Sequence, residues 1–288
     1  MNLGCHYWGQ GRFVLNLGDA LVPLILEHLG YGCQAPAKSQ TVGNPGRTLL
    51  IIGSLLDDAD LDRLDGPIDV WGCGWRGRPL ASRNRDRLHI HAVRGPLTVR
   101  GLELPPDMPV GDPGFLMPRI IAPPRHRNGQ RLVLPHCLRI GRTRIDERLR
   151  ATGADRVLSP WVLRRQGRLR PRTLLQDARR LLAAGTRPMG PVQAVQAIAG
   201  AGFVLTGSLH GAILSHAYGT PWAAYDDLGI DTPAKWQDLA TLLGIDIALV
   251  RSIREGEAWW DRTGQWAAIP DMDAMLRAFP HPRTEMTG

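Results

Sequence analysis

Short apolar runs alternate with amphipathic segments along most of the chain. The runs have the length of buried strands and the segments have the period of helices, which together predict βαβ units and a parallel sheet. The predicted strands are residues 48–52, 68–71, 88–93, 131–134, 203–205 and 222–225. The predicted helices are residues 20–29, 173–183, 191–199, 209–218 and 233–243. The pattern therefore places the chain in the α/β class.

A stretch rich in proline and arginine, residues 117–129, divides this pattern into two α/β halves. Few contacts are expected to cross such a stretch. The 288 residues also leave room for two domains of ordinary size. We predict domains at 1–122 and 131–279, joined by a linker at 123–130 and followed by a flexible tail at 280–288.

The strand predicted at 203–205 leads into the helix at 209–218 through a short turn. Ser208 is a favourable N-cap residue, which places His210 in the first turn of the helix. That turn follows the carboxyl end of a strand, where open α/β sheets bind ligands and free backbone N–H groups attract anions. His210 is therefore a candidate for acid–base chemistry, and a core histidine with one hydrogen bond is the alternative.

Asn16, Gly18 and Asp19 lie at the start of the helix predicted at 20–29. Aspartate is a preferred N-cap residue, so capping is the favoured role of Asp19. Gly18 would let a ligand approach the backbone closely. Contact with a ligand is the alternative role for this turn.

A glycine-rich turn follows the strand at 68–71. Gly72, Gly74 and Gly77 formally match the G-x-G-x-x-G pattern of dinucleotide-binding proteins. That pattern requires an apolar helix directly after the turn, whereas the polar segment 78–84 follows here. We therefore exclude NAD and FAD and expect only a loop that lines a cleft.

Further candidate residues lie in turns or directly after predicted strands. Arg94 follows the strand at 88–93 and stands beside Pro96, which fits the first position of a helix. An arginine beside free helix N–H groups suits a phosphate or carboxylate, and a surface ion pair is an equal alternative. Asp112 lies in a turn-rich element and is interpreted as structural, while His136 ends at the same sheet edge as the other candidates.

The net charge is +8, and the positive charge is almost entirely arginine, since the only lysines are Lys38 and Lys235. Arginine suits bidentate binding of phosphate and carboxylate, although a GC-rich genome produces the same bias. Basic and aromatic residues do not alternate in a nucleic-acid-binding pattern, so no nucleic-acid partner is expected. The basic run at 164–172 is interpreted as a solvated loop, with contact to anionic lipid as the alternative.

No apolar run approaches the roughly 20 residues of a membrane-spanning helix, and no secretory signal opens the sequence. We therefore predict a cytoplasmic location. His89 and His91 share one strand face without a third ligand, so no metal is expected. The four cysteines form no C-x-x-C pair and are expected to be reduced thiols: Cys5, Cys33, Cys73 and Cys137.

The order and spacing of these motifs resemble the polysaccharide pyruvyl transferase family, especially its branch of bacterial exopolysaccharide ketal-forming proteins. The resemblance runs from about Tyr7 to Ile245. It is carried by the segments 16–21, 71–74, 93–98, 110–113, 134–136, 208–212, 217–221 and 235–238.

The resemblance implies a fold similar to GT-B glycosyltransferases, with two Rossmann-like domains facing across a cleft. It also implies the reaction, in which phosphoenolpyruvate donates a pyruvyl ketal to two hydroxyls of a saccharide and releases phosphate, without a cofactor. The acceptor in such exopolysaccharide pathways can be lipid-linked, which would bring the protein to the inner face of the membrane.

By the same resemblance His210 is the acid–base group or a donor to phosphate, and Arg94 holds the anionic donor. Lys235 supplies a second cation. The other residues expected to contact substrate are Asn16, Gly18, Asp19, Gly74, Arg76, Asp112, His136, Ser208, Leu209 and Gly211.

Several family members carry an arginine directly before the Leu-His pair, where this chain has Ser208. Part of the donor contact would then come from Lys235 or Arg76. One alternative function is a nucleotide-sugar glycosyltransferase on the same fold, in which Asp226 or Asp227 would bind the ribose. A non-catalytic relative is the second alternative. The sequence does not indicate the oligomeric state.

Overall fold

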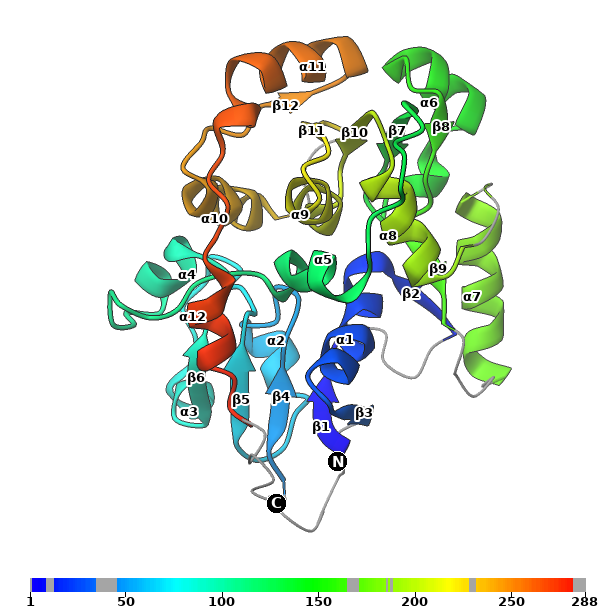
Figure 1. Cartoon of the computed structure of the whole chain (residues 1–288). Coiled ribbons are helices and arrows are strands. Elements are labelled where there is room, and N and C mark those ends of the chain that lie inside the picture. The colour runs from blue at the N-terminus through cyan, green and yellow to red at the C-terminus, as the bar shows by residue number, and fades with distance from the viewer. Residues whose placement is uncertain are drawn as a thin grey trace, which may run out of the picture.

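The computed structural model describes residues 2–8, 13–34, 46–164, 171–184, 186, 189–227 and 232–281. The fold is α/β and contains two parallel sheets of five strands each (Figure 1). The first sheet contains β1 (Asn2–His6), β3 (Gly32–Gln34), β4 (Thr48–Leu50), β5 (Ile68–Trp71) and β6 (Leu88–Ala92). The second contains β7 (Arg131–Leu134), β8 (Arg156–Val157), β10 (Phe203–Thr206), β11 (Trp222–Tyr225) and β12 (Leu249–Val250).

The two sheets follow the same strand order. The first runs β3-β1-β4-β5-β6 and the second runs β8-β7-β10-β11-β12, so each reads 2-1-3-4-5 when its strands are counted along the chain. In such a sheet the chain reverses its direction of travel between strands 1 and 3, and ligands bind outside the carboxyl ends of the strands at this switch point. The switch points here lie between β1 and β4 and between β7 and β10.

Helices surround both sheets (Figure 1). The first half contains α1 (Leu17–His28), α2 (Asp58–Leu61), α3 (Ser82–Arg85), α4 (Pro96–Gly101), the 3-10 helix η1 (Pro113–Leu116) and α5 (Met117–Ile120). The second half contains η2 (Ile140–Arg142), α6 (Ile145–Thr152), α7 (Pro171–Ala184), α8 (Pro191–Ala199), α9 (Leu209–Ala217), α10 (Pro233–Leu243), α11 (Ile253–Arg262), η3 (Gly264–Trp266) and α12 (Met272–Arg277).

Packed elements join the two halves. α4 packs against α10, α1 against α8, and α5 against α9. The short strands β2 (Val14–Asn16) and β9 (Trp161–Leu163) pair antiparallel, one from each half. The larger cluster of buried hydrophobic side chains contains residues from both sheets, so the halves share a core.

The last helix, α12, returns to the first sheet (Figure 1). The indole Nε1–H of Trp71 in β5 donates a hydrogen bond of 2.7 Å to the Met275 carbonyl. Phe279 makes an edge contact with the Trp71 ring, with 4.9 Å between the centroids. Residues 123–130, all of which are described, contain neither helix nor strand.

All predicted strands and helices are present, with ends that shift by up to three residues. The helix predicted at 20–29 begins at Leu17. Asn16 is therefore its N-cap position, and Asp19 lies inside the first turn. The prediction that Asp19 caps this helix is wrong, because two cap-forming residue types stand three positions apart and the chain enters the helix at the first.

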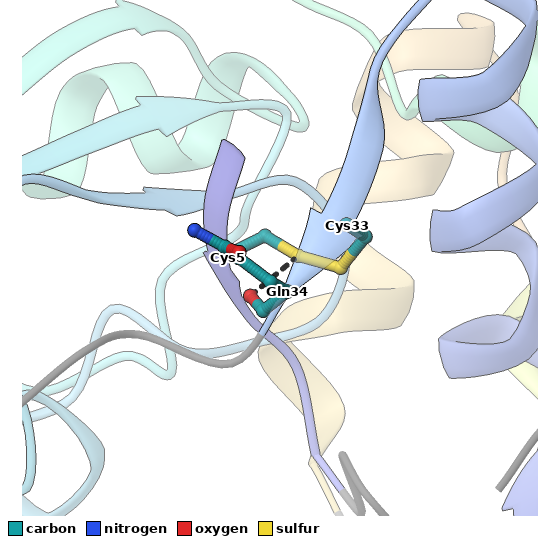
Figure 2. The surroundings of a disulfide bond; sticks show 3 residues. All are labelled: Cys5, Cys33 and Gln34. Carbon is teal, nitrogen blue, oxygen red and sulfur yellow. Dashed lines mark hydrogen bonds between the residues drawn. A yellow bond between two sulfur atoms is a disulfide. The ribbon is translucent and has the colours of Figure 1, made fainter. Parts of the chain in front are cut away.

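Cys5 and Cys33 form a disulfide bond, with 6.0 Å between their Cα atoms. Figure 2 shows that it joins β1 to the neighbouring edge strand β3. The prediction of four reduced thiols is wrong for this pair, because parallel pairing of two strands brings together cysteines that no sequence motif connects. Cys73 and Cys137 remain thiols rather than disulfide partners, and burial raises the pKa of the Cys73 thiol.

Within the described residues no helix is long and apolar enough to cross a membrane. The same part of the chain contains no group of three or more side chains placed to bind a metal ion. Lys38, most of the basic run (165–170) and the tail from residue 282 lie outside the described residues.

Candidate active site

A pocket of about 220 Å³ lies where the switch points of the two sheets meet. Four strand ends supply much of its lining: Trp8 follows β1, Gly53 and Ser54 follow β4, His136 and Cys137 follow β7, and Ser208, Leu209 and His210 follow β10. The remaining lining residues are Asn16, Asp19, Leu55, Arg76, Arg94, Leu138, Thr232 and Lys235. Both sheets therefore bring their ligand-binding edges to one cavity.

The positions of the strands within the two sheets define two ends of this pocket. Arg94 follows β6 and Lys235 lies at the start of α10 after β11, so both belong to the side where α4 and α10 pack together. We call this side the Arg94 end. Trp8 and His136 follow β1 and β7, on the side where β2 pairs with β9, and we call it the Trp8 end. His210 follows β10, between the two ends.

His210 is 8% exposed and is paired with a buried carboxylate. Its Nε2 lies 3.6 Å from Oδ2 of Asp112, which is fully buried. The other oxygen of Asp112 accepts a 2.8 Å hydrogen bond from the Gly114 N–H. Neither Nε2 nor Oδ2 makes a hydrogen bond within the described residues. A buried carboxylate therefore lies behind the imidazole, an arrangement that also occurs in sites where a histidine transfers protons.

The ring of His210 packs closely on the first turn of α1. A Cβ atom built on Gly18 would lie 2.1 Å from Nδ1 of His210, a separation that no side chain can occupy. Gly18 is therefore needed for the position of the ring, and it is not among the lining residues. The glycine serves the site by allowing a side chain, rather than a ligand, to approach its backbone.

Arg94 lies in the wall of the pocket and is 1% exposed. Its Nη1 donates a 2.8 Å hydrogen bond to Ser54 Oγ, and its Nε lies 3.5 Å from Oδ2 of Asp238. Nε and Nη2 make no hydrogen bond within the described residues. A Cβ on Gly74 would lie 2.1 Å from the guanidinium, so this glycine makes room for Arg94. A buried guanidinium with spare donors is suited to a carboxylate or phosphate.

Asp238 is a site residue whose role cannot be derived from the sequence. It is buried on α10, and its Oδ1 accepts a 2.9 Å hydrogen bond from the Leu97 N–H. Its Oδ2 accepts a 2.7 Å hydrogen bond from the Thr98 hydroxyl. Asp238 therefore satisfies the start of α4 from the other half of the molecule and holds Arg94 beside it.

Asp19 lines the pocket and is almost fully buried. Burial raises the pKa of its carboxyl to about 8, against the opposing effect of hydrogen bonds from the Asn16 side chain and the Trp8 backbone. A carboxyl with this pKa carries its proton at neutral pH. The pocket therefore contains an uncharged acid in addition to its cations.

Arg76 and Lys235 add positive charge to the Arg94 end. Arg76 extends from the glycine-rich loop and pairs with Asp60 at 3.1 Å, and its Nε–H donates a 2.6 Å hydrogen bond to the Ser54 carbonyl. Lys235 is buried in the first turn of α10. The structure thus brings together three of the basic residues expected from the sequence.

Ser208 is the N-cap position of α9, as predicted, but its side chain makes no capping hydrogen bond. Its N–H instead donates a 3.0 Å hydrogen bond to the Thr206 hydroxyl. Leu209 lines the pocket. Gly211 lies away from it, because a Cβ there would be 2.2 Å from Thr206 Oγ1, so this glycine permits α9 to pack on β10.

The acidic residues considered for ribose binding lie outside the lining of this pocket. Asp226 pairs with Arg251 at 3.2 Å. Asp227 pairs with the buried Arg148 at 2.6 Å. Both carboxylates are therefore engaged with arginines of the second half.

A second, larger pocket of about 620 Å³ lies between α4 and α10. Its lining includes Arg100 and Gln237 but neither His210 nor Arg94. The histidine and the buried guanidinium thus select the smaller pocket as the candidate active site.

Trp8 and Ser54 are lining residues that the sequence analysis missed. Both stand just beyond short strands of the first sheet, and β1 was not predicted because its five residues include Gly4 and His6. Recognition of β1 would have placed Trp8 at the same edge as the other candidates.

No curated protein matches the chain at a significant level. A family model described as polysaccharide pyruvyl transferase matches residues 16–227. The match includes the first turn of α1, the glycine-rich loop, Arg94, Asp112, His136 and the start of α9, and it spans more than half of the chain. The chain therefore belongs to the polysaccharide pyruvyl transferase family.

Proposed function

We propose that this protein transfers a pyruvyl ketal group from phosphoenolpyruvate to a saccharide acceptor. The observation that carries the proposal is that one pocket contains both a buried imidazole backed by a carboxylate and a buried guanidinium with unused donors. The imidazole and its carboxylate suit proton transfer, and the guanidinium suits a small molecule with several negative charges.

The Arg94 end is the proposed donor site. Phosphoenolpyruvate carries a carboxylate and a phosphate, and Arg94, Lys235 and Arg76 provide positive charge at this end. The free N–H groups at the start of α9 add a further anion-binding element beside His210. The cations of α10 and the glycine-rich loop take the place of the arginine that Ser208 replaces.

The chemistry assigns a proton-transfer role to His210. One sugar hydroxyl adds to C2 of the enolpyruvyl group and loses its proton, while C3 gains a proton and becomes a methyl group. The second hydroxyl then forms its bond to C2 as the bond to the phosphate oxygen breaks, and phosphate leaves with the remaining proton. His210 accepts a hydroxyl proton, and Asp112 stabilises the resulting imidazolium.

A nucleotide-sugar donor is less well supported. Among the described lining residues of the pocket only Asp19 carries a carboxyl group, and that carboxyl is uncharged at neutral pH. Asp226 and Asp227, the residues that would bind a ribose, pair with arginines instead. A small anionic donor agrees better with both observations.

We further propose that the halves act as GT-B-like domains, 1–122 and 131–279, that close over the donor. Two observations support this proposal: the two sheets have the same strand order, and both halves line the pocket. α12 would tie the second half back to the first sheet through Trp71.

Contact with an anionic membrane surface is proposed for α7. Leu175 and Leu182 are exposed and stand seven residues apart, which places them on one side of the helix, with the exposed Arg179 between them. The sequence before and into this helix, residues 164–172, contains five arginines. Exposed leucines beside basic residues are typical of interfacial helices. The L175D/L182D variant is expected to sediment less with phosphatidylglycerol vesicles, whereas I269D, at an exposed site elsewhere, keeps wild-type binding.

Calorimetry with phosphoenolpyruvate, UDP-glucose and GDP-mannose tests the donor. Phosphoenolpyruvate should bind and raise the melting temperature, by the stabilisation of about 2.7 kcal/mol expected at 100 times the dissociation constant. The nucleotide sugars should not. Binding of a nucleotide sugar without binding of phosphoenolpyruvate would overturn the proposed donor.

A further inference from the structure

We infer that the Trp8 end of the pocket is a saccharide subsite, in which a pyranose ring stacks on the Trp8 indole and its hydroxyls bind Asn16 and Asp19. This inference rests on the proposed function, because it assigns the acceptor to the end of the pocket opposite the proposed donor site.

The Trp8 indole is held in place while a large part of it is exposed. The residue is 36% exposed and lines the pocket. Its ring centroid lies 5.9 Å from that of Trp161, which is buried on β9. The Arg180 guanidinium on α7 lies 5.2 Å from the Trp8 ring centroid and 4.4 Å from that of Trp161. Two contacts from the second half therefore support a ring that the first half supplies.

The arginine that supports Trp8 is fixed in turn. Nη1 of Arg180 lies 3.5 Å from Oδ1 of Asp177, which is buried. The other oxygen of Asp177 accepts a 3.2 Å hydrogen bond from the Phe13 N–H, just before β2. Because β2 and β9 pair directly beside this cluster, the indole is positioned before any ligand arrives. A preorganised aromatic surface loses little conformational entropy on binding.

The polar neighbours of Trp8 match hydroxyl groups. Asn16 lines the pocket and offers both a donor and an acceptor. Asp19 is linked to the Trp8 backbone by a hydrogen bond, and at neutral pH its protonated carboxyl also donates and accepts. Sugars present C–H groups on their ring faces and hydroxyls at their edges, so they bind where an aromatic face adjoins such groups.

The distribution of charge separates this subsite from the donor site. The arginines and lysine among the described lining residues are Arg76, Arg94 and Lys235, which follow β5, β6 and β11. None of them follows β1 or β7, the strands that border the Trp8 end. The Arg180 guanidinium beside Trp8 is paired with the Asp177 carboxylate. A neutral sugar therefore fits this end, with His210 between it and the anionic donor.

The test measures binding of a panel of methyl hexopyranosides by calorimetry, with wild-type protein, W8A and W8F. Methyl glycosides are used because an aromatic aglycone would itself stack on an indole. We expect W8A to weaken binding of the preferred hexoside about tenfold or more, and W8F to restore most of it. W266A, which removes an exposed tryptophan on η3, is the matched control and should bind as wild type does.

Phosphoenolpyruvate binding is measured on the same variants. An unchanged dissociation constant for phosphoenolpyruvate in W8A supports two separate subsites. Unchanged hexoside binding in W8A, equal loss of both ligands, or no hexoside binding by the wild type would each overturn the subsite. If hexosides bind through Trp8 and phosphoenolpyruvate does not bind at all, the subsite stands and the proposed donor fails.

Discussion

The Arg94 end and the Trp8 end of the pocket differ in charge and in how tightly neighbouring residues hold their side chains. At the Arg94 end a fully buried guanidinium lies between the Ser54 hydroxyl and the Asp238 carboxylate. At the Trp8 end a partly exposed indole lines the pocket together with Asp19, whose carboxyl is uncharged at neutral pH because burial raises its pKa to about 8. One fold thus supplies a cationic region and a neutral region, and two substrates of different charge can be separated within one pocket.

The largest effect is expected from the ionisation of Asp19 at the Trp8 end of the pocket. The pKa of Asp19 is higher in the folded protein, about 8, than the ordinary 3.8 of the unfolded chain. The bound proton therefore stabilises the native state fully below about pH 4, and this stabilisation is lost as the pH rises through 8. The stability of D19N lacks this dependence on pH. When the pH is raised from 5 to 9, the free energy of unfolding of D19N should therefore increase by about 4 kcal/mol relative to that of the wild type.

Urea denaturation at these two pH values measures the difference. D65N, which changes an exposed aspartate of the first half, is the control and should show no gain. A D19N difference that does not change with pH would mean that Asp19 is already ionised at pH 5, and the neutral end would not exist.

The next effect concerns the cationic end. R94K keeps one positive charge but loses the planar set of donors that can bind a carboxylate or phosphate with two hydrogen bonds. We expect the dissociation constant for phosphoenolpyruvate to rise about 100-fold, which corresponds to about 2.7 kcal/mol. Hexoside binding should be unchanged. A parallel loss of hexoside binding would show that the two ends do not act separately.

A smaller effect is expected where the two ends meet. A methyl group on Gly18 would overlap Nδ1 of His210, so G18A must displace the ring. We expect kcat to fall about tenfold while both substrates still bind. G190A places a methyl group whose nearest neighbour is 4.0 Å away, and it should keep full activity. Wild-type kcat in G18A would show that the ring position is not critical.

The sequence predicted those parts of the site in which the signal is local. The apolar run of β10, the turn at Ser208 and the first turn of α9 are contiguous, so the position of His210 followed from one short segment. The strands β8 and β12 have two residues each, too few for any periodicity to register. Short strands of this kind form because their neighbours pair with them.

Contacts between distant residues could not be predicted. Asp238 binds Thr98 and Arg94 across 140 and 144 positions of the sequence, and nothing in either segment indicates the other. The Cys5–Cys33 disulfide depends on the parallel pairing of β1 with β3. The preference of aspartate for N-cap positions favoured a capping role for Asp19, and this preference carries no information on burial. Burial determines the charge of Asp19 in the structure.

The central claim is that His210 transfers protons to and from bound substrates. Phosphate release from phosphoenolpyruvate with the preferred hexoside tests it in wild type, H210A and H216A, where His216 lies on the same helix and contacts the Ala268 carbonyl instead. The account predicts that H210A loses about 100-fold or more of the rate and still binds phosphoenolpyruvate, while H216A remains active. Wild-type phosphate release by H210A would contradict it.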